Sequence, residues 1–142
     1  SFPEALSEIV IQEEPFVFAA HESILADELK EILKNHPFFH FMADTGIGKL
    51  ITNEMLGYGR PRGARTVVLD NLEAIMECVA AGLGFTLLPQ PDVERYRTKC
   101  VKMIPSPKPF HRKLVLATAR DGTFASRDRS LAALLGVETA TR

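Results

Sequence analysis

The clearest candidate for a ligand-binding segment follows the apolar run 37–42. Its residues are Asp44, Thr45, Gly46 and Ile47. A helical pattern begins directly after them, so they should lie at the carboxyl end of a strand and at a helix N-terminus. Free backbone N–H groups and the positive end of the helix dipole make such a position suited to polar or anionic small molecules. A plain capping role for Asp44 or Thr45 explains the same residues equally well, and one residue can fill both roles.

A second pair of candidates, Asp70 and Asn71, follows the apolar run 65–69. These two residues should also lie at the carboxyl end of a strand, where ligands of α/β proteins bind. Capping of the helix that follows is the simpler explanation for both. Phe85 and Thr86 lie nearer the amino end of their strand, so we expect them in the core.

The sequence shows no arrangement of residues typical of catalysis or of a metal centre. The four histidines are scattered, and Pro37 prevents a helix that would align His36 with His40. Thr45-Gly-Ile-Gly-Lys49 lacks the first glycine of a phosphate loop and the Ser or Thr after its lysine. We therefore expect a protein that is not an enzyme and that uses neither a metal ion nor a cofactor.

Composition excludes further classes of function. The 142 residues carry 17 basic and 18 acidic side chains and a net charge of −1, with no basic run of the kind that binds DNA. No apolar stretch reaches the ~18 residues of a membrane span. Cys78 and Cys100 are the only cysteines, which fits a reducing cytoplasm.

The strongest structural pattern runs from residue 72 to residue 89 and predicts a helix, a glycine turn and a strand. The apolar residues of one helical face are Leu72, Ile75, Met76 and Val79. Asp70 is the expected N-cap, with Glu73 completing a capping box. Gly82 suits the left-handed residue that ends a helix, and Gly84 leads directly into the apolar strand 85–88. A helix followed so closely by a strand predicts an α/β sandwich with a parallel sheet.

The remaining patterns extend this alternation over most of the chain. Expected strands are 8–12, 15–20, 37–42, 65–69, 100–104 and 113–118, and expected helices are 27–33, 47–55, 92–96 and one that begins at Ser126. The proline-rich segment 105–109 is the best candidate for a linker. The tail after Gly136 should be frayed. Residues from about 17 to 104 therefore form a complete doubly wound unit, and the elements outside it lack neighbours.

Several of these segments together resemble the effector-binding domain of LysR-type transcriptional regulators. The most recognisable stretch is Val79-Ala-Ala-Gly-Leu-Gly-Phe-Thr-Leu-Leu-Pro89, preceded by Asp70-Asn-Leu-Glu-Ala-Ile75. Glu13-Glu-Pro-Phe-Val-Phe-Ala-Ala20 resembles the family's entry strand, and Lys113-Leu-Val-Leu-Ala-Thr118 resembles its return strand. The resemblance covers nearly the whole chain, and it rests on the order and spacing of apolar patterns.

The resemblance implies a doubly wound α/β sandwich like that of periplasmic binding proteins (type 2), with one complete subdomain and part of a second. It divides the chain into a crossover strand with part of subdomain I (1–16), subdomain II (17–112), and the return strand and C-terminal helix of subdomain I (113–142). The family's winged helix-turn-helix and the first elements of its first subdomain have no counterpart in this sequence.

The function that the resemblance implies is a cytoplasmic sensor that binds a small-molecule inducer between two subdomains to control transcription. In the family, the loop at Thr45, Gly46 and Ile47 faces the inducer. The implied partners are a polar or anionic inducer, a second copy of the protein in a homo-oligomer, most simply a dimer, and DNA through another domain only. A fragment of a periplasmic solute-binding protein serving a transporter is the leading alternative. An enzyme on the same fold is a third.

Overall fold

The structure is a computed structural model that describes residues 6–24, 29–107, 111–119 and 137–141, with side chains described for 13–24 and 29–107. Its strands are β1 (Leu6–His21), β2 (Phe38–Phe41), β3 (Thr66–Leu69), β4 (Phe85–Pro89), β5 (Val101–Pro105), β6 (His111–Ala119) and β7 (Val137–Thr141). Its helices are α1 (Leu29–Asn35), α2 (Gly46–Leu56), α3 (Leu72–Ala80) and α4 (Gln90–Tyr96). Strand and helix alternate from β2 to β5, as the sequence predicts.

The strands form one mixed sheet in the order β3-β2-β4-β1-β6-β7, with β5 pairing with β1 outside this path. β2 runs parallel to β3 and β4, whereas β1 runs antiparallel to β4, β5 and β6. The expectation of a wholly parallel sheet is therefore wrong for β1. The residues of β1 are apolar because helices cover both faces of the sheet. Burial on both faces is typical of parallel strands, but it does not determine the direction of a strand.

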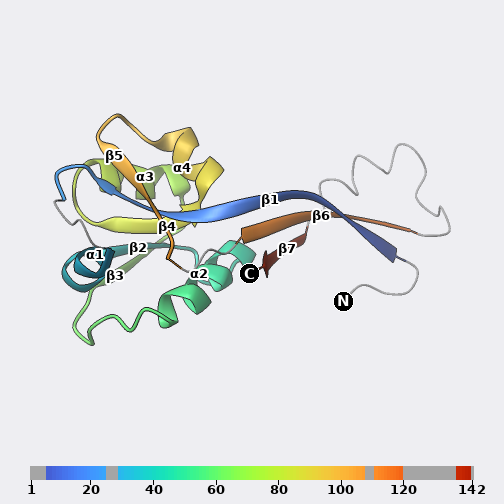
Figure 1. The fold of residues 1–142 in the computed structure, drawn as a ribbon, viewed down its shortest axis with the longest axis horizontal. Helices are drawn as coiled ribbons and strands as arrows, with labels where there is room; N and C mark the ends of the chain where they lie inside the picture. The colour runs from blue at the N-terminus through green and yellow to red at the C-terminus, as the bar shows by residue number, and fades with distance from the viewer. Residues whose placement is uncertain (1–5, 25–28, 108–110, 120–136, 142) are drawn as a thin grey trace.

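The two strands predicted at 8–12 and 15–20 are one continuous strand, β1. Pro15 looks like a break in the sequence, but it lies where β1 changes partners. Residues Leu6–Pro15 pair with β6, and Phe16–Ala20 pair with β4 on one side while Val17–His21 pair with β5. A proline, which has no N–H to donate, is tolerated at such a junction. β1 consequently extends past the helix-covered part of the sheet to reach β6 (Figure 1).

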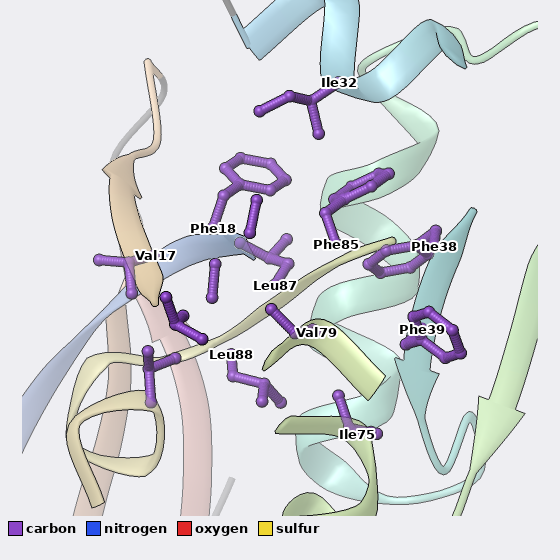
Figure 2. Close-up of a cluster of buried hydrophobic side chains, with 14 of the residues drawn as sticks. Val17, Phe18, Ile32, Phe38, Phe39, Ile75, Val79, Phe85, Leu87 and Leu88 are labelled. Atoms are coloured by element: carbon purple, nitrogen blue, oxygen red, sulfur yellow. The ribbon is translucent and has the colours of Figure 1, made fainter. Parts of the chain in front are cut away.

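Helices cover both faces of the sheet and enclose two layers of core. α3 and α4 lie on one face and α1 and α2 on the other (Figure 1). Figure 2 shows Phe18, Phe38 and Phe85 on the side of Ile32 in α1, with ring centroids 5.1 Å apart for Phe38 and Phe85. On the other side of the sheet, the side chains of Ile75, Val79 and Leu88 pack together (Figure 2). Phe85 and Thr86 are fully buried, which confirms their assignment to the core.

The turn from α3 to β4 follows the glycine pattern, but the N-cap of α3 differs from the prediction. Gly82 has a φ of +76°, in the left-handed region. A side chain on Gly84 would lie 2.2 Å from the carbonyl oxygen of Pro37, so only glycine allows this approach. The N-cap is Asn71, whose side chain accepts a hydrogen bond from the Ala74 N–H at 2.9 Å. The prediction of Asp70 as the cap, and of a capping box with Glu73, is wrong by one residue.

The C-terminal part departs further from the sequence prediction. Val137–Thr141 forms β7, which runs antiparallel to β6, so the expectation of a frayed tail is wrong. The reason is that β6 provides β7 with hydrogen-bond partners, and the sequence of a short segment does not reveal a distant partner. The predicted helix from Ser126 lies outside the described residues. The expected linker is anchored at its start, because the hydroxyl groups of Ser106 and Tyr58 are 2.8 Å apart and hydrogen-bonded, and Ser106 is buried.

Candidate functional site

The candidate site lies where the three parallel strands end. Since β2, β3 and β4 are parallel, their carboxyl ends share one edge of the sheet. The loop after β2 and the loop after β3 are joined there by a hydrogen bond from the Met42 N–H to the Leu69 carbonyl oxygen, at 2.9 Å. The structure thus brings the two groups of predicted residues to neighbouring loops.

The strand order reverses between β2 and β4, and we call this place the switch point. From β2 the chain passes through α2 to β3, on one side of β2. From β3 it returns through α3, on the opposite face, to β4, on the other side of β2. The connections after β2 and β4 therefore diverge, and α/β proteins bind ligands beside such a point, at the carboxyl ends of the strands.

Thr45 holds the first turn of α2 in place. It is the N-cap residue; its hydroxyl accepts a hydrogen bond from the Gly48 N–H at 2.9 Å and donates one to the Met42 carbonyl at 2.8 Å. The capping role considered for Thr45 is therefore real.

The next two residues of the first turn place backbone donors at the carboxyl edge of the sheet. Helix geometry gives the N–H groups of Gly46 and Ile47 no acceptor inside α2. Gly46 is exposed and Ile47 is partly buried against the core. Asp44 is exposed just before the cap, and in the part of the chain that the structure describes its side chain makes no hydrogen bond with another residue. Asp70 and Asn71 are both exposed, and Asn71 is occupied as the cap of α3.

Sequence patterns miss the residue on the other side of the switch point. Gln90 opens α4 immediately after β4, and its amide donates to the Glu94 carboxylate at 2.6 Å. The signal was present in Pro89, because a proline that ends a buried strand before a helix marks a carboxyl-edge loop. We add Gln90 to the candidates on its position alone.

A buried histidine connects β2 to α2 behind this edge. His40 Nε2 lies 2.9 Å from the hydroxyl of Thr52, which donates its own proton to the Gly48 carbonyl at 2.9 Å. His40 Nδ1 lies 2.8 Å from the Phe41 carbonyl oxygen. The Phe41 carbonyl oxygen can only accept, so Nδ1 carries a proton in the neutral ring as well as in the charged one, and a second proton on Nε2 would donate to the Thr52 hydroxyl. Burial nevertheless lowers the pKa of His40 below its ordinary value of 6.5, although the Phe41 carbonyl opposes this shift.

We expect this histidine to make folding sensitive to mild acid. Its pKa is lower in the folded chain than in the unfolded chain, so the unfolded chain takes up the proton first as the pH falls below about 6.5. The free energy of unfolding should therefore decrease between pH 7.5 and pH 5, and His40→Gln should reduce that slope. Urea unfolding across this range measures it, with His36→Gln as the control for losing one imidazole. Equal slopes in His40→Gln and the wild type would contradict the assignment.

Three further features of the chain bear on metal binding, thiol chemistry and membrane association. The described residues include no group of three or more His, Cys, Asp or Glu side chains positioned to hold a metal ion. Cys78 and Cys100 are free thiols and partly buried. In the described part of the chain, no helix is both long and apolar enough to span a bilayer.

Comparison with known proteins places the chain in a family. The LysR substrate binding domain profile matches residues 2–136, whereas no curated protein sequence matches. The regulatory domain of Synechocystis PCC6803 CcmR, solved with 2-PG, is 17% identical with a TM-score of 0.66, over 95% of this chain and 68% of that one.

Two further structures share the fold. The BenM effector-binding domain with benzoate is 14% identical with a TM-score of 0.62, over 94% of this chain and 62% of that one. CbnR, described as a LysR family transcriptional regulator, is 12% identical with a TM-score of 0.62, over 94% of this chain and 48% of that one. The chain thus spans about three fifths of the BenM domain's length. These matches confirm the expected α/β sandwich of the type 2 periplasmic binding proteins, and the chain belongs to the LysR substrate-binding domain family.

Proposed function

We propose that this chain is the ligand-sensing part of a LysR-type transcriptional regulator. A small-molecule inducer would bind at the carboxyl edge of β2, β3 and β4 and change the angle between two subdomains, and so the spacing of the DNA-binding domains. The observation that carries the proposal is that α2 begins at Gly46 beside the switch point of a fold that the family uses, so that the N–H groups of Gly46 and Ile47 have no acceptor within the helix.

The chemistry of the edge favours a polar or anionic inducer. The N–H groups and the positive end of the α2 dipole attract negative charge, and Lys49 is exposed in the first turns of α2. BenM was solved with benzoate, a carboxylate of this kind. Asp44 and Asp70 are the unfavourable charges among these candidates, and their exposure to solvent weakens their repulsion. Asp70 and Asn71 on the neighbouring loop would contact the uncharged part of the ligand.

The proposed regulator would act in the cytoplasm as a homo-oligomer, most simply a dimer. β3 ends the sheet with β2 as its neighbour, and such an edge strand favours association. Contact with DNA would belong to a separate domain, because this chain has a net charge of −1. The proposed division at 1–16, 17–112 and 113–142 fits one long strand, β1, that crosses from one subdomain to the other. The family match favours this sensor over the transporter alternative, and no step of the proposed mechanism requires catalysis.

The proposal can be tested at Gly46, where a side chain should block the carboxyl edge of the sheet without disturbing the fold. Gly46 is exposed, and its φ is not positive, so leucine fits its backbone. We expect small carboxylates titrated into the ¹⁵N-labelled chain to shift the amide resonances of Gly46 and Ile47. Gly46→Leu should weaken binding of the carboxylate with the highest affinity by about tenfold or more. The leucine side chain would keep the carboxylate from its charge-assisted hydrogen bonds with the backbone N–H groups.

The matched control is Gly57→Leu at the other end of α2. Gly57 is also exposed, and its φ is −69°, so the same change in size is made 11 residues from the loop. The control should bind like the wild type, and both variants should keep the wild-type melting temperature to within a few degrees. Equal binding by Gly46→Leu and the wild type would show that the loop is only a helix cap.

A further inference from the structure

A cavity lies along α2, on the face of the sheet that α1 and α2 cover. Its volume is about 470 Å³, which is the size of a small-molecule site. The residues that form its apolar wall are Phe38, Ala43, Met55, Leu56, Pro61 and Ala64. Its polar lining comes from His40, Thr52, Arg60 and Thr66, and none of the lining residues is a carboxylate. The candidate residues of the carboxyl edge, Asp44–Ile47, Asp70 and Asn71, do not line it.

Arg60 brings a positive charge to this cavity, and none of the described side chains that it contacts is a carboxylate. Its guanidinium donates to the carbonyl oxygens of Leu33 at 2.9 Å, His36 at 2.8 Å and Arg65 at 3.2 Å, and to the Thr66 hydroxyl at 3.1 Å. All four acceptors are uncharged. The group also lies over the rings of Phe38 and Phe85, at 5.7 and 5.4 Å from their centroids. These contacts fix its position before any ligand arrives.

Two donors remain at one point of the lining. A guanidinium has five N–H groups, and the four bonds leave one N–H on Nη1 without an acceptor among the described residues. The Thr66 hydroxyl accepts from the same Nη1, so its own proton is available, and no described acceptor receives it. The two donor atoms are 3.1 Å apart, a spacing that suits the two oxygens of one carboxylate.

We propose that this cavity is a second ligand site, for a small organic acid of single-ring size. Its carboxylate binds Arg60 Nη1 and the Thr66 hydroxyl, and its apolar body packs on Phe38, Met55 and Leu56. An inorganic anion would leave that apolar wall without a partner. The site stands independently of the carboxyl-edge site, because the two share no residue.

Benzoate is the probe for this site, and benzamide is its uncharged counterpart of equal size. We expect benzoate, titrated into the ¹⁵N-labelled 142-residue chain, to shift the amide resonances of Leu56 and Thr66. Benzamide should bind about tenfold more weakly, because its neutral amide carries no negative charge to pair with the Arg60 guanidinium. Since Thr66 is exposed, its variants should fold. Thr66→Val should weaken benzoate binding about fivefold, and Thr66→Ser should restore it.

The apolar wall has a matched test in two exposed leucines. Leu56 lines the cavity and is 75% exposed, whereas Leu83 is 57% exposed in the turn before β4 and does not line it. Leu56→Ala should weaken benzoate binding severalfold and Leu83→Ala should not. Equal affinity for benzoate and benzamide would overturn the proposal, as would shifts confined to Gly46 and Ile47, which would support the carboxyl-edge site alone. An absence of shifts at Leu56 and Thr66 at tens of millimolar benzoate would overturn it too.

Discussion

Gly48→Ala should lower the free energy of unfolding by about 3 kcal/mol or more, the upper range for forcing atoms into a packed site. A Cβ at Gly48 would lie 1.7 Å from the Met42 carbonyl oxygen, 2.6 Å from its carbon and 2.9 Å from the Phe41 carbonyl oxygen. All three atoms belong to the backbone of β2 and its following loop, so no side chain can rotate away. The first turn of α2 would have to move off β2, and the Gly48 contact with the Thr45 cap would be lost with it.

Thermal and urea unfolding measure this effect, and Gly63→Ala is the matched control. Gly63 has no heavy atom within 4 Å of its ideal Cβ, and its φ is not positive. Its replacement by alanine should change the free energy of unfolding by less than about 1 kcal/mol, in the stabilising direction, because it restricts the unfolded chain. If both variants unfold alike, α2 does not pack on the β2 loop as closely as the structure places it.

Arg60→Met should lower the free energy of unfolding by about 2–3 kcal/mol. The variant keeps much of the apolar stem but leaves the carbonyl oxygens of Leu33, His36 and Arg65 without their donor, at about 1 kcal/mol each. Leu33 belongs to α1, His36 precedes β2, and Arg65 precedes β3, so one side chain joins three segments.

Arg62→Met in the same loop is the control, because Arg62 is exposed and makes no hydrogen bond with another described residue. Its effect should stay within about 0.5 kcal/mol. Arg60→Lys separates charge from geometry, since lysine keeps the charge but cannot reach the four acceptors with one planar group. Lysine should therefore recover only part of the loss. If Arg60→Met and Arg60→Lys had the same urea midpoint as the wild type and as Arg62→Met, the hydrogen bonds of Arg60 would not stabilise the fold.

Local patterns suffice for the elements that a few neighbouring residues determine. The helix that begins at Leu72 shows its buried face directly in the sequence, and Gly82 announces the left-handed turn that ends it. The alternation of strand and helix from β2 to β5 follows in the same way, because each element carries its own apolar period. The identity of the family then came from the order of these elements.

Features that depend on distant contacts could not be found in this way. Nothing in residues 6–21 reveals that β1 is one strand, because its three partners lie far along the chain. No local pattern around Arg60 indicates its contacts, and only the fold places it over Phe38 and Phe85. At the carboxyl edge the position of Thr45 was predictable, whereas Gln90 required knowledge of which strands are neighbours. The N-cap of α3 moved by one residue because Asp70 and Asn71 are both good caps and their local patterns do not separate them.

The pairing of β1 has a consequence for how the chain emerges from the ribosome. β1 is synthesised first among the described elements, yet β4, β5 and β6 are made only after most of the chain has followed it. At about 5–20 residues per second, the apolar run Phe16–Ala20 waits several seconds for its neighbours. During that interval its unpaired backbone and apolar side chains are open to chaperones and to other nascent chains. Translation speed over the codons for residues 22–119 should therefore influence the yield of folded protein more than translation speed over the codons for β1.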